Sequence, residues 1–230
     1  EEAGVGTICI GVDLATSEKA VALATAHESI WAIVGQHPTE WEKDFDIDAF
    51  EKLAGDARVV GIGECGLDYY RETERTENAK DIQRLLFMEH IEIAHEANLP
   101  LMLHIRPQQG TMDAYEDALN ILEKHKIEYP DLRGTAHFFV GNTEIAQRFL
   151  DLGFYISFSG VITIFPEYEE VVRFVPIDRI LPETDAPFAA PKSHRGTRNE
   201  PVYVLEVVEK IAELKGLSIE ETKAVLLQNT

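Results

Sequence analysis

Short apolar runs that favour β-strands alternate with longer helical patterns along the whole of this sequence. The alternation predicts βα units and a parallel sheet, because parallel strands need a long crossover connection and a helix usually provides it. The expected strands are Thr7–Gly11, Ile30–Gly35, Val59–Glu64, Leu99–Ile105, Gly134–Phe139, Phe154–Ser159 and Ile180–Thr184. The expected helices are Ser17–His27, Asp46–Leu53, Thr76–Ala97, Ala114–His125, Thr143–Leu152, Pro166–Phe174, Pro201–Lys215 and Ile219–Gln228.

Seven such units favour an α/β fold, the (β/α)8 TIM barrel, with its first strand missing from this sequence. Residues 1–230 have the length of one barrel domain, so a single domain is expected. The first four residues, Glu1–Gly4, are similar to the tail of a helix that ends at a glycine, which predicts a βα unit before them. An open, doubly wound sheet is the alternative, because seven parallel strands need no closure.

Charge and composition argue against a protein that coats nucleic acid, spans a membrane or depends on cysteine cross-links. The 41 acidic residues against 21 basic ones give a net charge of −20, so any phosphate group must be captured locally. No apolar run is long enough to span a membrane, and no secretory signal is visible. Cys9 and Cys65 form no C-x-x-C pair, so neither a disulfide framework nor a cysteine zinc site is expected, and the predicted location is cytoplasmic.

Residue types that bind metal ions follow the predicted strands. His37, Glu64, His104, His137 and Asp185 each lie where one of these strands ends. Because ligands in parallel α/β folds bind at the carboxyl ends of the strands, we expect these side chains on one rim.

The convergence of several strand ends favours a metal centre made of Glu64, His104, His137 and Asp185. A single histidine at a strand end is more often a hydrogen-bonded structural residue. Buried together without an ion, these four groups would cost roughly several kcal/mol in unpaired charge. Mixed nitrogen and oxygen ligands suit Zn²⁺, Mn²⁺ or a similar ion, and predict hydrolysis by an activated water.

A basic segment, residues 190–199, follows Asp185 in this acidic chain. The loop after the last strand of a barrel is a frequent phosphate site, so His194, Arg195 and Arg198 are expected to bind phosphate. A solvated surface turn is the alternative interpretation.

Two further side chains are candidates for binding substrate. Arg106, two residues beyond His104, is expected to bind phosphate at the same rim, or else to pair with a carboxylate. Tyr69, together with Tyr70 and Arg71, is expected to stack on a base or sugar beside the phosphate, with ordinary packing as the alternative.

The remaining motifs carry no catalytic role. Gly61-Ile62-Gly63 lacks the third glycine and the following helix of a dinucleotide-binding fingerprint. Solvent-facing or capping roles are expected for the histidines within predicted helices, which are His27, His90, His95 and His125.

The motifs at the strand ends resemble those of the TatD family of metal-dependent deoxyribonucleases. They are, in order along the chain, GIGECGLDYY at 61–70, HIR at 104–106, HFF at 137–139, ETDAP at 183–187 and RGTRNEP at 195–201. The resemblance implies an amidohydrolase-like barrel with two divalent ions, Mg²⁺, Mn²⁺ or Zn²⁺, and hydrolysis of phosphodiesters, often from the 3′ end of DNA.

The resemblance also implies a role for each matching residue. Glu64 would bridge the two ions, His104 and His137 would bind one of them, and Asp185 would bind the other or its water. Asp185 would also act as the general base, and Glu64 is counted with it as catalytic. Single-stranded DNA or a 3′ end is the expected partner, and no membrane is expected.

The sequence departs from the family pattern at its beginning. Members begin with a strand ending in H-x-H, and no H-x-H occurs in these residues. The chain is therefore expected to be clipped at its beginning, and a protein beginning at Glu1 to be a poor nuclease. It is also expected to be clipped at its end, where residues 226–230 resemble the start of a closing N-T-x-x-x-F motif. The alternatives are a barrel hydrolase of a small amide, ester or lactone, and a non-catalytic binding barrel.

Overall fold

The computed structural model describes residues 4–71 and 73–230, and the chain divides into two compact units, Gly6–Thr135 and Ala136–Thr230. The division falls within strand β5 (Gly134–Ala136). The elements of the first unit before β5 are β1 (Thr7–Ile10), α1 (Leu14–Ala26), β2 (Ile30–Val34), η1 (Pro38–Glu40), α2 (Ile47–Ala54), β3 (Val59–Asp68), α3 (Glu77–Glu96), β4 (Leu101–Arg106) and α4 (Asp113–Glu128).

The elements of the second unit after β5 are α5 (Thr143–Asp151), β6 (Tyr155–Phe158), η2 (Gly160–Thr163), η3 (Pro166–Tyr168), α6 (Glu169–Phe174), η4 (Ile177–Arg179), β7 (Ile180–Pro182), η5 (Lys192–His194), η6 (Pro201–Tyr203), α7 (Val204–Lys215) and α8 (Ile219–Asn229). All of the expected strands and helices are confirmed, with shifts at their ends. Whether residues 1–230 form one domain stays a prediction.

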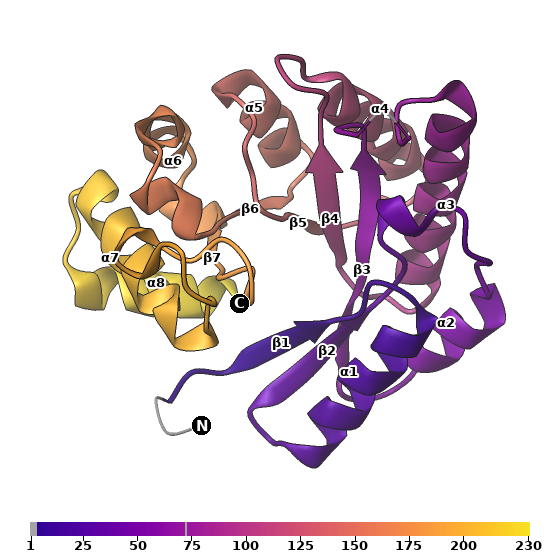
Figure 1. The fold of residues 1–230 in the computed structure, drawn as a ribbon, viewed down its shortest axis with the longest axis horizontal. Helices are drawn as coiled ribbons and strands as arrows, with labels where there is room; N and C mark the ends of the chain where they lie inside the picture. Colours follow the sequence, from indigo (N-terminus) through magenta and orange to yellow (C-terminus); the bar gives the residue numbers. More distant parts are fainter. Residues whose placement is uncertain (1–3, 72) are drawn as a thin grey trace. The chain divides into compact units, whose positions relative to one another are not determined.

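Strands that follow one another in the chain are parallel neighbours in the sheet. In the first unit β1 pairs with β2, β2 with β3 and β3 with β4, while β6 pairs with β7 in the second. Helices α1 and α3 pack against β2 and β3 respectively (Figure 1). This parallel arrangement brings the carboxyl ends of β2, β3 and β4 to one edge of the first unit, which is where ligands bind in such folds.

Strand β3 is four residues longer than the sequence predicts, because it continues through the glycine-rich motif to Asp68. Gly63 and Gly66 have φ values of +151° and +133°. A Cβ atom at Gly66 would lie 2.2 Å from the carbonyl oxygen of His104. Glycine thus lets β3 stay in contact with β4 beside Glu64, where any larger residue would push the strands apart.

Helix boundaries follow local capping chemistry. The side chain of Asp13 accepts a hydrogen bond from the N–H of Thr16 at the start of α1, and Thr76 and Asn142 cap α3 and α5 in the same way. Ser218 and Glu221 form a capping box at α8. These side chains satisfy backbone donors that the first turn of a helix leaves unpaired.

Helix α3 buries an apolar stripe against the sheet, with Phe87, Ile91 and Ala94 almost inaccessible to solvent. His90 lies in the same stripe and is 1% exposed, so the expected solvent-facing or capping role is wrong for it. The helical period places residue 90 next to 87, 91 and 94, and that burial outweighs the polarity of the imidazole.

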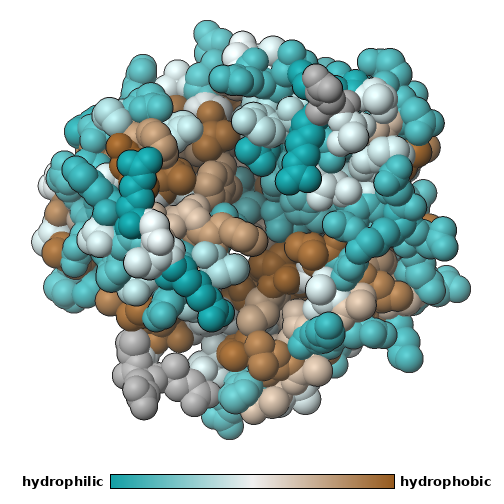
Figure 2. All heavy atoms as spheres, viewed as in Figure 1, coloured by the Kyte–Doolittle hydropathy of each residue, from teal (hydrophilic) through white to brown (hydrophobic). Residues whose placement is uncertain are grey.

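Hydrophilic side chains cover most of the face drawn in Figure 2, with hydrophobic ones in patches between them. This agrees with the net charge of −20. Within the described residues, every helix is too short or too polar to cross a membrane.

Candidate metal centre

The ends of β2, β3 and β4 bring His37, Glu64 and His104 together in the first unit. One ligand atom from each lies within 4.8 Å of the others. Glu64 Oε1 is 2.9 Å from His104 Nδ1 and 3.6 Å from His37 Nε2, and the two imidazole centroids are 4.2 Å apart. We call these three residues the strand-end cluster. Two imidazoles and a carboxylate are the donor set of many zinc and manganese sites.

His104 is held between two carboxylates. Its Nδ1 faces Glu64, and its Nε2 lies 3.0 Å from Asp68 Oδ2. Burial lowers the pKa of His104, but hydrogen bonds to Asp68 and Glu64 outweigh it and raise the pKa to about 9. Burial likewise opposes ionisation of Asp68, yet the His104 hydrogen bond keeps its pKa below the usual range. The surroundings therefore favour a positive charge at this point.

The backbone around the strand-end cluster is fixed by buried hydrogen bonds. Gln36 donates its backbone N–H to Nε2 of buried His90 at 2.9 Å, directly before His37. The ring of His37 is oriented by Thr39, whose hydroxyl lies 2.8 Å from Nδ1. The N–H of Glu64 donates to the carbonyl of Gly11, directly after β1. These bonds hold the three donor side chains on ordered strand ends, which a metal site requires.

The donor chemistry of the strand-end cluster fits a divalent ion. The side chains of His37, Glu64 and His104 are 15%, 14% and 18% exposed, so they are largely buried but still reached by solvent. Asp68 would accept the second N–H of His104, which is the outer-shell arrangement that orients metal-binding histidines and raises their basicity.

Replacing Asp68 with Asn is expected to weaken binding of Mn²⁺ or Zn²⁺ by about 10–100-fold, because His104 loses its charged hydrogen-bond acceptor. Calorimetric titration with each metal measures the change. Asp44→Asn, at an exposed position, is the matched control and should bind metal as the unchanged protein does. Equal affinities in both variants would rule out the orienting role of Asp68.

A second pair of candidate ligands lies in the other unit. His137 Nε2 is 3.8 Å from Asp185 Oδ1, and His137 Nδ1 is 2.8 Å from Glu183 Oε2. Glu183 also accepts the backbone N–H of Phe138 and the hydroxyl of Ser157. Glu183 therefore orients the imidazole of His137, as Asp68 orients that of His104.

Asn199 organises the loop that carries Asp185. Its side-chain nitrogen donates to the carbonyls of Thr184 and Phe188, each at 2.6 Å, and it is 2% exposed. Asp185 has a φ of +59°, a left-handed conformation that costs a non-glycine residue about 1 kcal/mol or more. The bonds from Asn199 help to maintain the surrounding loop.

The structure brings the predicted ligands together in pairs, Glu64 with His104 and His137 with Asp185. That all four share ions stays a prediction. Sequence reasoning gave no ligand role to His37, although its place in Gly35-Gln36-His37-Pro38 carried the same strand-end signal as the others. It also assigned no role to Asp68 and Glu183, whose contacts depend on the tertiary structure.

The predicted phosphate-binding residues differ in their surroundings. Within residues 4–71 and 73–230, the guanidinium groups of Arg106, Arg195 and Arg198 have no carboxylate within ion-pair distance, and all three residues are exposed. His194 stacks on Tyr203 at 3.7 Å between centroids, and its Nε2 is 3.0 Å from Glu206. The roles of these four residues in binding phosphate stay predictions.

The expectation that Tyr69 stacks on a base or sugar is wrong. The residue is 0% exposed, its hydroxyl donates to Asp117 at 3.0 Å, and Lys80 lies over its ring. Burial, with the nearby charge of Asp117, raises the pKa of the Tyr69 hydroxyl far above its usual value. Tyr70, the next residue and also beyond the end of β3, is 44% exposed instead.

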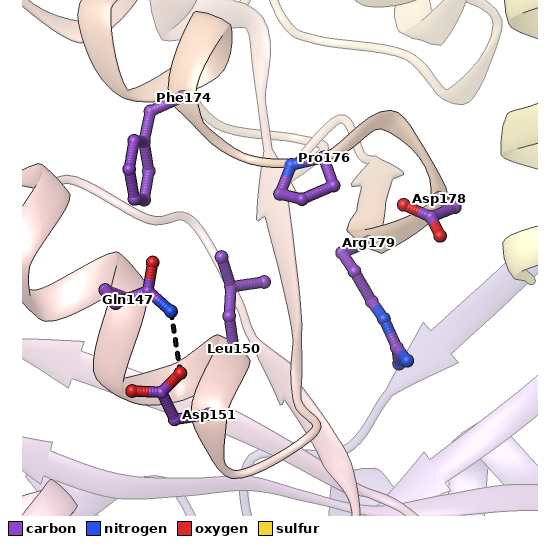
Figure 3. A pocket seen from close by; sticks show the side chains of 7 residues that line it. All are labelled: Gln147, Leu150, Asp151, Phe174, Pro176, Asp178 and Arg179. Carbon is purple, nitrogen blue, oxygen red and sulfur yellow. Dashed lines mark hydrogen bonds between the residues drawn. The ribbon is translucent and has the colours of Figure 1, made fainter.

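A cavity of about 370 Å³ in the second unit is separate from these ligands. Gln147, Leu150, Asp151, Phe174, Pro176, Asp178 and Arg179 line it (Figure 3). These residues precede β6 and β7, at the amino ends of the strands, whereas Asp185 follows β7. The cavity therefore lies at the opposite end of β7 from the candidate ligand.

Comparison with known protein families places the chain. The family described as TatD related DNase matches residues 1–230. The chain belongs to the TatD-related DNase family. Its fold is that of a TatD-like TIM barrel, since the crystal structure of the TatD homologue YJJV from Escherichia coli K12 superposes with a TM-score of 0.88 at 28% identity, covering 100% of this chain and 86% of that one.

Two curated relatives of this TatD-family chain are named only as metal-dependent hydrolases. The chain is 41% identical over 197 residues to uncharacterized metal-dependent hydrolase YcfH of Escherichia coli K12, covering 85% of this chain and 70% of the relative. It is 37% identical over 226 residues to YabD of Bacillus subtilis, covering 96% and 84%. A third relative, from Shigella flexneri, is named 3′-5′ ssDNA/RNA exonuclease TatD and is 31% identical over 226 residues, covering 94% and 82%. The chain is accordingly a member of a family of metal-dependent hydrolases.

Proposed function

We propose that this TatD-family protein hydrolyses phosphodiester bonds of single-stranded DNA from the 3′ end, using two divalent ions. The observation that carries the proposal is the strand-end cluster, a metal-donor set whose His104 lies in a strand that ends in the exposed cation Arg106. Family membership and the name of the Shigella relative support a nucleic acid as the substrate.

In this proposal, His37, Glu64 and His104 of the first unit would hold one ion, and His137 and Asp185 of the second unit would hold another. When bound, the ions supply an activated water and neutralise charge on the phosphoryl oxygens.

The chain's own residues perform the remaining steps of the proposed reaction. Asp185 accepts the proton of the attacking water, and His137, which Glu183 orients, lies 3.8 Å from that carboxylate. Arg106, Arg195 and Arg198 bind the phosphate and balance its charge through N–H groups that no described carboxylate engages. We place this activity in a reducing cytoplasm, which is consistent with the free thiols of Cys9 and Cys65.

The test is metal-dependent shortening of a 5′-labelled single-stranded oligonucleotide. With Mn²⁺ we expect slow loss of nucleotides from the 3′ end, which stops when EDTA is added and resumes when excess Mn²⁺ is restored. Gel electrophoresis of the products measures both rate and polarity. Turnover of a lactone or amide with no shortening of DNA would favour the alternative of a small-molecule hydrolase and overturn the proposal.

A further inference from the structure

Tyr70 and Arg106 form a stacked pair where β3 and β4 end. The guanidinium carbon of Arg106 lies 3.8 Å from the centroid of the Tyr70 ring. Tyr70 is 44% exposed, and Arg106 is also exposed. A large aromatic ring and a cation are therefore presented to solvent side by side.

The stacked pair is joined to the strand-end cluster through Asp68. Asp68 lies opposite Arg106 in the register of β3 and β4. Its Oδ1 accepts the backbone N–H of Tyr70 at 2.9 Å, while its Oδ2 is 3.0 Å from His104 Nε2. The backbone N–H of Tyr69 donates to the carbonyl of Arg106 at 2.7 Å. One buried carboxylate thus positions both the stacked pair and a candidate metal ligand.

The arrangement leaves the hydrogen-bonding edge of Arg106 available. The Tyr70 ring lies over the guanidinium carbon, and the guanidinium N–H groups of Arg106 have no hydrogen-bond acceptor among residues 4–71 and 73–230. In-plane N–H groups on a stacked guanidinium bind phosphate in a fixed orientation. In a chain of net charge −20, such a cation beside a metal-donor set favours an anionic substrate.

We propose that Tyr70 and Arg106 form a nucleotide subsite, in which Arg106 binds a phosphate and the exposed ring of Tyr70 stacks on the adjoining base of a single strand. The inference rests on the proposed function and adds to it the substrate feature that is recognised, an unpaired base. Stacking on an aromatic ring is possible for every base, so the subsite would distinguish single strands from duplexes without reading sequence.

Binding of two single-stranded phosphorothioate decamers tests the subsite. One decamer carries bases throughout, and the other has abasic residues at its last two 3′ positions. Fluorescence anisotropy with Mn²⁺ gives both affinities as a function of salt concentration. The unchanged protein is expected to bind the fully based decamer about 10-fold more tightly, because one stacked base contributes roughly 5- to 100-fold in affinity.

The variants separate stacking from charge. Tyr70→Ala should abolish the preference for the based decamer, and Tyr70→Phe should restore it. Arg106→Gln should weaken binding of both decamers and lower the salt dependence by about one phosphate contact. Arg179→Gln is the matched control, because Arg179 packs over Tyr155 at 5.3 Å but precedes β7, at the amino end of the strand (Figure 3). This control should bind both decamers as the unchanged protein does.

Cleavage of the unmodified based decamer is measured in parallel, so that the two proposals fail in different ways. If the unchanged protein cleaves the decamer and Tyr70→Ala still prefers the based decamer, the subsite proposal is overturned and the nuclease proposal is retained. Binding that depends on Tyr70, without cleavage in Mn²⁺, would overturn the nuclease and support the subsite. A protein that binds neither decamer would overturn both.

Discussion

Replacing Glu64 with Gln is expected to lower the affinity for Mn²⁺ or Zn²⁺ and the kcat/KM for oligonucleotide cleavage by more than the roughly 10–100-fold that loss of an outer-shell partner costs. The reason is the central position of Glu64, whose Oε1 is 2.9 Å from His104 and 3.6 Å from His37. A neutral amide is a weaker ligand for a divalent cation and leaves the two imidazoles without the charge between them. Calorimetric metal titration and initial rates measure the two effects.

The matched control for this change is Glu51→Gln, at an exposed position on α2. It should leave metal affinity and rate unchanged, and circular dichroism should show that both variants are folded. Metal affinity retained in a folded Glu64→Gln protein would remove the strand-end cluster as the metal site.

The stability of the first unit is expected to fall as the pH drops from about 6.5 to 4, through His90. Burial lowers the pKa of His90 to about 4, despite a hydrogen bond to the carbonyl of Leu86. Its Nε2 accepts the N–H of Gln36, and the rings of Phe45 and Phe50 pack around it. Below pH 6.5 the unfolded chain binds a proton at this histidine and the folded chain does not, so stability decreases until about pH 4, where both bind it. The loss attributable to His90 is about 3 kcal/mol.

Urea unfolding of the unchanged protein and of His90→Gln, at pH 7 and pH 5, isolates this contribution. At pH 7 the variant should be less stable, because the buried N–H of Gln36 loses the imidazole nitrogen that accepts its hydrogen bond, and the surrounding core must repack. The difference in free energy of unfolding between the two proteins should shrink by about 2 kcal/mol on going to pH 5. Ile91→Val, which alters the same buried stripe without a titrating group, should show a difference that does not vary with pH. An invariant difference for His90→Gln would contradict the prediction.

The residues at the strand ends show which features of this protein can be predicted from local sequence patterns. The succession of strands and helices and the positions of Glu64, His104, His137 and Asp185 at their strand ends were predictable, because strand and helix periods and turn chemistry act over a few residues. The TatD motifs lie at these same positions, so the family was predictable as well.

Contacts between segments distant in sequence required the structure. The two nitrogens of His104 meet Glu64 and Asp68, and His137 meets Glu183, through pairings separated by 36 to 46 residues. A sequence pattern fixes which face of a strand carries a side chain, but not which partner on another strand lies within hydrogen-bond distance. The proximity of His37 to Glu64 and His104 is likewise a contact between distant segments that only the tertiary structure shows.

The sequence by itself determined the succession of strands and helices, the acidic charge and the family, since each depends on residue type and short-range spacing. Only the tertiary structure decided that Tyr69 is buried while Tyr70 stacks on Arg106, and that His90 lies in the core beneath the strand ends. Both outcomes depend on packing between elements, where burial of apolar area and the pairing of buried polar groups outweigh local preference.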